Sequence, residues 1–208
     1  MSQIKSIVPL LGRQKVIPVV VIEDEQQALG LSQALLDGGV TVIEITLRNQ
    51  FGLRAIELVK SNFPQMLVIA GTVNSAAAVG RVRNAGADAI VSPGVTNAIL
   101  EEVIKQNIPY LPGVATPSEV LQVMEMGFTE CKLFPASVVG GVAALKAFSG
   151  PFPDIKFCPT GGISPSNYAD YLALENVICV GGSWIAPGTL IRDHDWQGIT
   201  GLCNTLTS

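Results

Sequence analysis

A lysine stands inside an otherwise apolar run, Cys131-Lys132-Leu133-Phe134. Lysine is seldom buried unless its charge serves a purpose. An apolar pocket favours the neutral amine, which can attack a carbonyl carbon and form a Schiff base. The alternative is a lysine at the rim of a strand, with its ammonium group in water, and spacing alone leaves both interpretations open. Lys156 lies near the start of another expected strand, so we interpret it as structural or exposed.

A carboxylate interrupts a second apolar run, Ile43-Glu44-Ile45-Thr46. Strand alternation places Glu44 and Thr46 on the same face. A buried carboxylate needs a partner, and either Arg48 or Lys132 could supply one. Such a pair can be structural only, but a carboxylate near the end of a strand favours a general acid or base.

Two residues after the expected strands suit an anionic substrate. Arg48 offers a planar fork that matches a carboxylate, although it could instead form an ion pair with Glu44. Thr72 could donate a hydrogen bond to the same carboxylate, or it could cap the helix that follows.

Glycine pairs follow the last two expected strands, as Gly161-Gly162 and Gly181-Gly182-Ser183. Glycine lets the backbone approach a ligand closely, so its N–H groups can bind a phosphate. Glycines are also common in plain turns. Two such pairs at this position favour a phosphate site, because barrels bind phosphate in the loops after strands 7 and 8.

These residues must be positioned by short β-rich runs that alternate with helical stretches along the whole chain. The expected strands are Val16–Ile22, Val40–Thr46, Leu67–Gly71, Asp88–Ser92, Pro109–Pro112, Glu130–Phe134, Ile155–Cys158 and Val177–Gly181. Eight strands, each followed by a helix, predict an α/β fold, a (β/α)8 TIM barrel, with residues 1–208 as a single domain. A dinucleotide-binding sheet would need a glycine-rich turn after the first strand, where Glu23-Asp24-Glu25 stands instead.

Composition supports a barrel and excludes several functions. The chain is 48% hydrophobic and 14% charged, which suits parallel strands buried on both faces. A net charge of −4 argues against nucleic acid as a partner. No apolar run reaches the roughly 18–20 residues of a membrane span, and no signal peptide is recognised, so we expect a cytoplasmic protein.

The sulfur and imidazole groups do not indicate a metal site or a triad. Cys131, Cys158, Cys179 and Cys203 are widely spaced in apolar segments, as expected of buried, reduced thiols. His194 is the only histidine, which argues against a Ser-His-Asp triad and against a site with several histidine ligands.

An ordered set of short motifs runs from the second expected strand to the last. They are Ile43-Glu44-Ile45-Thr46-Leu47-Arg48, Ala70-Gly71-Thr72-Val73, Ser92-Pro93-Gly94, Cys131-Lys132-Leu133-Phe134-Pro135-Ala136, Phe157-Cys158-Pro159-Thr160-Gly161-Gly162-Ile163-Ser164-Pro165-Ser166-Asn167-Tyr168 and Gly181-Gly182-Ser183-Trp184. With this set the chain closely resembles the bacterial aldolases of 2-keto-3-deoxy-6-phosphogluconate (KDPG) and 4-hydroxy-2-oxoglutarate (KHG).

The resemblance implies a homotrimeric class I aldolase with no metal or other cofactor, acting on a small phosphorylated keto acid. It implies that Lys132 forms the imine and that Glu44 shuttles protons. The remaining implied substrate contacts are Arg48 and Thr72 at the carboxylate, Pro93 and Phe134 along the pocket, and Thr160, Gly161, Gly162, Gly182 and Ser183 on the phosphate side. Ser137-Val138-Val139 stands where related enzymes vary and has no assigned role.

Three alternatives remain open. A sibling aldolase acts on the C4 epimer, 2-keto-3-deoxy-6-phosphogalactonate, but that branch typically replaces Thr46 and Arg48 by proline and asparagine. A phosphate-binding barrel isomerase would use Glu44 as its base and Lys132 only electrostatically. A barrel that binds a phosphorylated metabolite without turnover is the third, and no residue of the sequence favours it.

Overall fold

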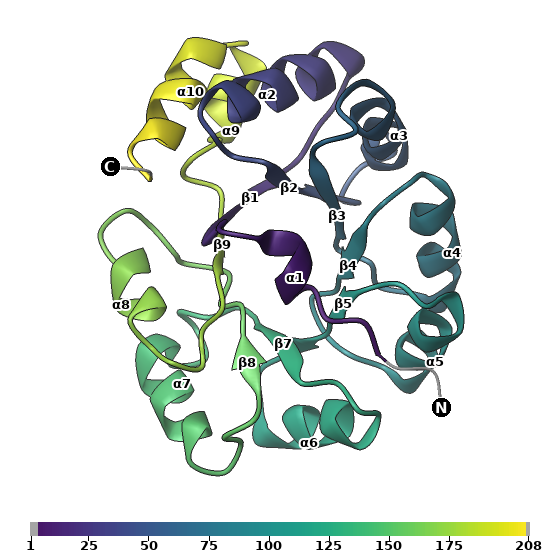
Figure 1. The fold of residues 1–208 in the computed structure, drawn as a ribbon, viewed down its shortest axis with the longest axis vertical. Coiled ribbons are helices and arrows are strands. Elements are labelled where there is room, and N and C mark those ends of the chain that lie inside the picture. The colour runs from purple at the N-terminus through teal and green to yellow at the C-terminus, as the bar shows by residue number, and fades with distance from the viewer. Residues whose placement is uncertain (1–3, 207–208) are drawn as a thin grey trace.

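The computed structural model describes residues 4–206, in which parallel strands form a ring surrounded by helices (Figure 1). The strands are β1 (Val16–Val20), β2 (Val42–Thr46), β3 (Leu67–Gly71), β4 (Ala89–Val91), β5 (Tyr110–Leu111), β6 (Gly113–Val114), β7 (Glu130–Leu133), β8 (Lys156–Phe157) and β9 (Val180–Gly182). Their β-branched, fully or largely buried sequences, such as Val-Ile-Glu-Ile-Thr in β2, are typical of strands covered on both faces.

Two hydrogen-bonded sheets and two isolated bridges close the ring of strands. One sheet has the order β5-β4-β3-β2-β1-β9, and a second has the order β6-β7-β8. Only Pro112 separates β5 from β6, and these two strands occupy one strand position of the barrel. The strand is interrupted at Pro112 because proline lacks an N–H group. Parallel bridges Phe157↔Val177 and Thr160↔Gly181 connect the β8 segment to the β9 segment. The predicted α/β barrel is therefore confirmed.

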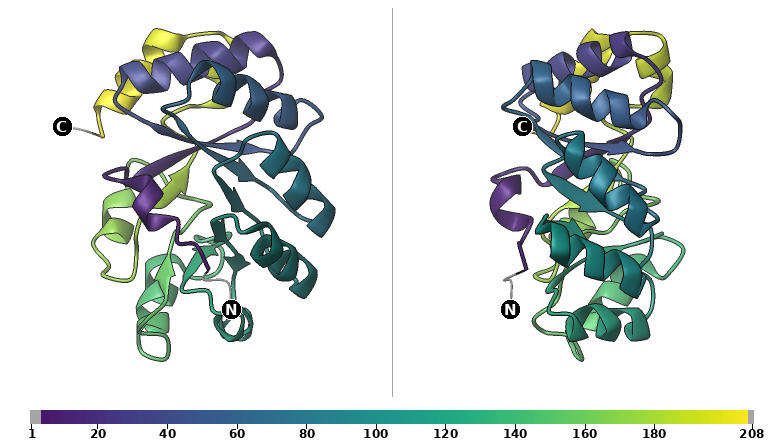
Figure 2. Two further views of the ribbon diagram at one scale, coloured as in Figure 1. Left: turned by 45° about the vertical axis from the view of Figure 1, so that its right-hand side comes forward. Right: turned by 90° about the vertical axis from the view of Figure 1, so that its right-hand side faces the viewer.

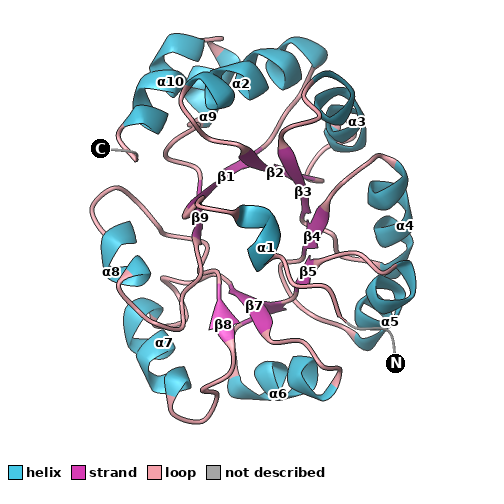
Figure 3. Cartoon of the chain, viewed as in Figure 1, coloured by secondary structure: helices cyan, strands magenta, loops and turns pink. Residues whose placement is uncertain are grey.

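The helices lie outside the ring, as the side views and the cartoon show (Figures 2 and 3). They are α2 (Glu25–Asp37), α3 (Gly52–Asn62), α4 (Ala76–Asn84), α5 (Asn97–Gln106), α6 (Pro117–Glu125), α7 (Gly141–Ser149), α8 (Tyr168–Leu172), α9 (Gly188–Arg192) and α10 (Trp196–Asn204). Local signals set several of their ends. Asp24 caps α2, and Thr116 with Glu119 forms a capping box at α6.

The N-terminal end of the barrel carries an element that the sequence did not predict. The short helix α1 (Val8–Leu11) lies across the centre of the ring in Figure 1. Ile7 and Leu11 are buried there, and the Ile7 amide donates a 2.8 Å hydrogen bond to Glu130 at the start of β7. This segment covers the end of the barrel opposite to the carboxyl ends of the strands.

Other expectations can be compared with the described residues. All four cysteines are buried and free, as predicted. The last strand begins at Val180 rather than Val177, because Val177 joins the ring only through a single bridge. No helix within residues 4–206 is long and apolar enough to cross a membrane. The single domain over residues 1–208 stays a prediction, and its first three and last two residues lie outside the described part.

Candidate active site

Lys132 and Glu44 meet inside the barrel. Lys132 on β7 and Glu44 on β2 are 5% and 3% exposed. The Lys132 Nζ donates to Glu44 Oε1 at 3.1 Å and to Oε2 at 3.4 Å. Two buried charges lose more hydration than their attraction returns in most settings, so such a pair is a poor choice for stability alone. Its geometry lets a proton move from the ammonium group to the carboxylate.

Both side chains are held by strand geometry and close packing. Glu44 pairs with Val19 on one side and with Ile69 on the other, which fixes its backbone in the middle of the sheet. The Lys132 amide donates to the Pro112 carbonyl at 2.8 Å. The Phe134 ring lies 5.4 Å from Lys132 Nζ, within the range of a cation–π interaction.

A cavity of about 190 Å³ opens at the carboxyl ends of the strands. Seven of the predicted site residues line it: Arg48, Phe134, Thr160, Gly161, Gly162, Gly182 and Ser183. Phe134 therefore connects the buried Lys132–Glu44 pair with this cavity. The structure therefore places the predicted catalytic pair, Lys132 and Glu44, next to most of the predicted substrate-binding residues.

The glycine pair after β8 adopts a conformation that few other residues tolerate. Gly161 has φ 98° and Gly162 has φ 75°. The loop is fastened to the segment after β7, because Ala136 and Ser137 donate to the carbonyls of Thr160 and Gly161 at 2.8 and 3.0 Å. Close backbone approach to a ligand is the use of glycine that fits this position.

Two predicted substrate-binding residues, Thr72 and Pro93, lie outside the lining of that cavity. Thr72 follows β3 and has φ 60°, a strained value for a β-branched residue, which is typical of functional positions. It does not cap the next helix, because Ser75 is the N-cap of α4. Pro93 follows β4 and is exposed. Its backbone packs against Gly113, so no side chain fits at residue 113.

Ser92 is a supporting residue to which sequence reasoning gave no role. Its buried hydroxyl donates to the Gly94 carbonyl at 2.6 Å and lies 2.5 Å from the Tyr110 hydroxyl. The Gly113 amide donates to the same oxygen at 3.3 Å. Ser92 therefore holds the turn that carries Pro93. Burial raises the pKa of the Tyr110 phenol, although its hydrogen bond with Ser92 acts in the opposite direction.

The competing features do not form a second centre. Lys156 donates to the Glu175 carbonyl at 3.3 Å, away from Glu44.

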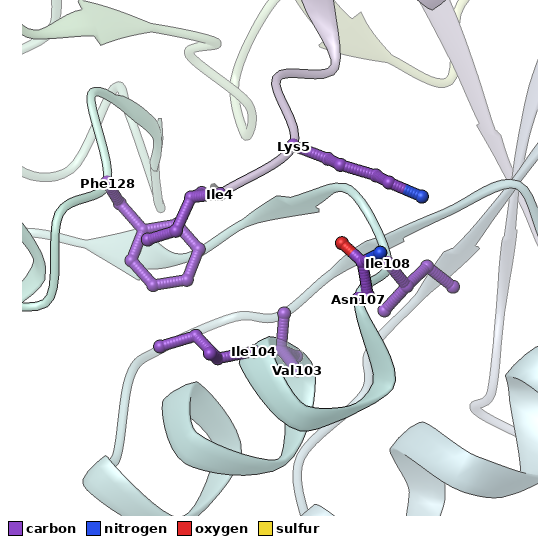
Figure 4. Close-up of a pocket in the computed structure, with 7 residues that line it drawn as sticks. All are labelled: Ile4, Lys5, Val103, Ile104, Asn107, Ile108 and Phe128. Atoms are coloured by element: carbon purple, nitrogen blue, oxygen red, sulfur yellow. The ribbon is translucent and has the colours of Figure 1, made fainter. Parts of the chain in front are cut away.

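The pocket in Figure 4 lies where Ile4 and Lys5 pack against Phe128 and α5, and its volume is about 10 Å³. That is barely room for one water molecule, so it is a packing gap. Within residues 4–206, no group of three or more histidine, cysteine, aspartate or glutamate side chains could hold a metal ion.

A buried amine beside a carboxylate, below an anion-suited cavity of a parallel barrel, defines the class of barrel proteins equipped for Schiff-base chemistry. The model of the family "KDPG and KHG aldolase" matches residues 7–202. The chain therefore belongs to the KDPG and KHG aldolase family.

Individual relatives agree with the family model. A 2-dehydro-3-deoxy-phosphogluconate aldolase of Pseudoalteromonas atlantica is 46% identical, over 90% of this chain and 87% of that protein. A KHG/KDPG aldolase of Escherichia coli K12 is 44% identical, over 93% and 91% of the two chains. The crystal structure of KDPG aldolase from Legionella pneumophila, with pyruvate captured as a covalent carbinolamine intermediate, has a TM-score of 0.95 and 45% identity and covers 98% of this chain and 99% of that one.

Proposed function

We propose that the protein is a class I aldolase that cleaves 2-keto-3-deoxy-6-phosphogluconate to pyruvate and glyceraldehyde 3-phosphate. It would also cleave 4-hydroxy-2-oxoglutarate to pyruvate and glyoxylate. The observation that carries the proposal is the buried contact of 3.1 Å between Lys132 Nζ and Glu44 Oε1. The carbinolamine in the Legionella pneumophila relative supports the same chemistry for a lysine in this fold.

The first half of the reaction forms the imine. Transfer of a proton from the Lys132 ammonium group to Glu44 leaves a neutral amine. The amine attacks the C2 ketone of the substrate to give a carbinolamine. Glu44 returns its proton to the departing hydroxyl group, and loss of one water molecule leaves a protonated imine and an ionised Glu44. The imine nitrogen then withdraws electrons from C3.

The second half breaks the carbon–carbon bond. Glu44 accepts the proton of the C4 hydroxyl group, the C3–C4 bond breaks, and its electrons pass into an enamine on Lys132. Glyceraldehyde 3-phosphate leaves as the aldehyde. Glu44 gives the proton it accepted to C3 of the enamine, which forms the pyruvate imine, and one water molecule hydrolyses the imine to pyruvate and free Lys132.

The two ends of the substrate would bind on different sides of the cavity. Arg48 and Thr72 would hold the keto-acid carboxylate, because a guanidinium group matches a carboxylate with two parallel hydrogen bonds. Pro93 and Phe134 would line the path between the ends. The phosphate side would be formed by Thr160, Gly161, Gly162, Gly182 and Ser183, of which all line the cavity.

The assembly and location of the protein belong to the same proposal. The family resemblance suggests a homotrimer that acts in the cytoplasm on a small phosphorylated keto acid, without nucleic acid or membrane as partner. Sedimentation equilibrium of the purified protein tests the trimer directly.

The decisive experiment traps the imine. The protein is incubated with pyruvate, reduced with borohydride and digested for peptide mass spectrometry. We expect one reduced pyruvyl adduct, on Lys132, together with cleavage of KDPG. A folded protein with unmodified Lys132 would instead favour the isomerase or the binding barrel. Preference for the galactonate epimer would identify the sibling aldolase.

A further inference from the structure

A second hollow, of about 200 Å³, adjoins the cavity at the carboxyl ends of the strands. The two spaces share Val19, Arg48 and Ser183 in their walls. The second hollow lies between the β1–α2 connection and α9, beyond the phosphate side of the proposed site. Nothing in the reaction described above uses the residues at its far wall.

The first cavity has fewer positive charges than the proposed substrate has negative charges. Within the described residues, Arg48 is the only cationic side chain that lines the first cavity. A substrate with a carboxylate and a phosphate carries about three negative charges at neutral pH, since the second pKa of a phosphate ester is near 6. If Arg48 binds the carboxylate, the phosphate depends on backbone amides and hydroxyl groups alone.

Arg192 supplies a cation at the second hollow. It is the last residue of α9, and its side chain folds back along the helix, with Nη1 3.2 Å from the position of a Cβ at Gly188. Arg192 forms no ion pair or hydrogen bond with any residue in the described part of the chain. An arginine without a carboxylate partner is available for an anionic ligand.

Gln27 adds a hydrogen-bond donor to the wall of the second hollow. Its side chain lines the hollow but is only 4% exposed. The Glu23 amide donates to Gln27 Oε1 at 2.9 Å, which assigns the other end of the side-chain amide as the NH₂ group. Gln27 Nε2 has no hydrogen-bond partner among residues 4–206. Among the described residues no side-chain nitrogen or oxygen sealed from solvent lacks a partner, so this NH₂ group is accessible and can donate to a ligand in the hollow.

We propose that Arg192 and Gln27 contact the distal phosphate of the substrate, and that they set the preference of this chain for phosphorylated over shorter, carboxylate-ended substrates. The inference rests on the proposed aldolase function. Among the described residues, Glu23 is the one carboxylate in the wall of this hollow, and the charges of Arg48 and Arg192 outweigh it.

The test compares two substrates in three variants. KDPG carries the phosphate, whereas KHG ends in a carboxylate and is too short to reach the second hollow when its ketone is at Lys132. R192A removes the cation. Q27E keeps an oxygen that can accept from the Glu23 amide but replaces the free donor by a negative charge. R81A is the matched control, because Arg81 is an exposed arginine on α4.

We expect R192A to raise KM for KDPG by roughly tenfold, the size of one lost charge-assisted contact at an open site, with kcat within about twofold. Q27E should raise the same KM by at least as much. KM for KHG and trapping of pyruvate on Lys132 should be unchanged in both variants. Inorganic phosphate should inhibit KDPG cleavage more weakly in R192A than in the wild type. R81A should match the wild type throughout.

Three results would contradict the inference. Unchanged KDPG kinetics in R192A and Q27E, with an active wild type, would overturn it and leave the proposed function intact. Equal losses for KDPG and KHG would mean that both residues act through the fold. A wild type that neither traps pyruvate nor cleaves KDPG would overturn the proposed function itself, and this inference with it.

Discussion

The Cα of Gly71 packs directly against the side chain of Glu44, so the backbone of β3 forms one wall of the Glu44 site. A Cβ at residue 71 would lie 2.7 Å from Glu44 Cγ and would overlap its carboxylate. Glycine at the end of β3 is therefore required by the position of Glu44 rather than by a turn, because Gly71 lacks a positive φ.

Gly71→Ala should displace Glu44 from Lys132. We expect kcat for KDPG to fall roughly 10–100-fold, the effect of misplacing a reacting group by about 1 Å. Overpacking should lower the free energy of unfolding by about 1–3 kcal/mol. Gly80→Ala on α4 is the matched control, because no atom lies within 4 Å of its Cβ position. Wild-type rates in Gly71→Ala would mean that Glu44 has room to move without loss of function.

Replacement of Lys132 tests the nucleophile. Lys132→Ala should abolish cleavage and borohydride trapping, because no other amine lies beside Glu44 within the described structure. Lys156→Ala, which removes a lysine that binds only the Glu175 carbonyl, should retain both. Cleavage near the wild-type rate in Lys132→Ala would rule out the Schiff-base mechanism.

Replacement of Glu44 tests the proton carrier. Glu44→Gln keeps the size of the side chain and an oxygen for Lys132 but cannot shuttle a proton. Steady-state kinetics should show kcat reduced by roughly 10²–10⁴-fold, with far-UV circular dichroism unchanged. A rate equal to that of the wild type would assign Glu44 a structural role.

Ser92→Ala should weaken the turn that carries Pro93. The substitution removes the partner of the buried Tyr110 hydroxyl and of the Gly94 carbonyl. Urea denaturation should give a loss of about 1–3 kcal/mol, the usual cost of a buried polar group left unpaired. The double variant with Tyr110→Phe should lose less than the sum of the two single variants, and full additivity would disprove the coupling.

Stability should decline at alkaline pH through Cys131. Burial is the main cause that raises the pKa of this thiol to about 12 from its ordinary value of 9.0. Because the pKa of the thiol is higher in the folded state than in the unfolded state, the protonated Cys131 costs no stability below pH 9. As the pH rises from 9 toward 12, ionisation of the unfolded thiol progressively lowers the free energy of unfolding. Between pH 8 and pH 10.5 we expect the wild type to lose about 2 kcal/mol more than Cys131→Ala in urea denaturation. Parallel curves for both proteins would refute this.

The barrel could be predicted from the sequence because its strands are short apolar runs that alternate with helical stretches. Gly86 and Gly127, which follow helices α4 and α6, have φ of 93° and 87°, a conformation that favours glycine between a helix and the next strand. Lys132 and Glu44 were recognisable for the same reason, as charges within such runs. The sequence left either Arg48 or Lys132 as the partner of Glu44. Lys132 and Glu44 are 88 positions apart, and only closure of the ring fixes the distance between Nζ and Oε1.

Other features left little trace in the sequence. The helix α1 has four residues, too few for a helical period to be recognised. The break between β5 and β6 depends on how Pro112 fits into the ring. Gln27 and Arg192 carry no motif, and their meeting at one hollow follows only from the positions of α2 and α9.

The position of α1 bears on the order in which products depart. Because this helix covers the N-terminal end of the barrel, we expect a molecule bound at Lys132 to enter and depart at the carboxyl ends of the strands alone (Figure 1). In the proposed reaction the pyruvate fragment is attached to Lys132 in the interior, whereas the aldehyde fragment would lie nearer the mouth. We therefore expect the aldehyde to diffuse out first and the keto acid to follow it by the same route. In the synthetic direction the sequence reverses, with pyruvate bound before the aldehyde.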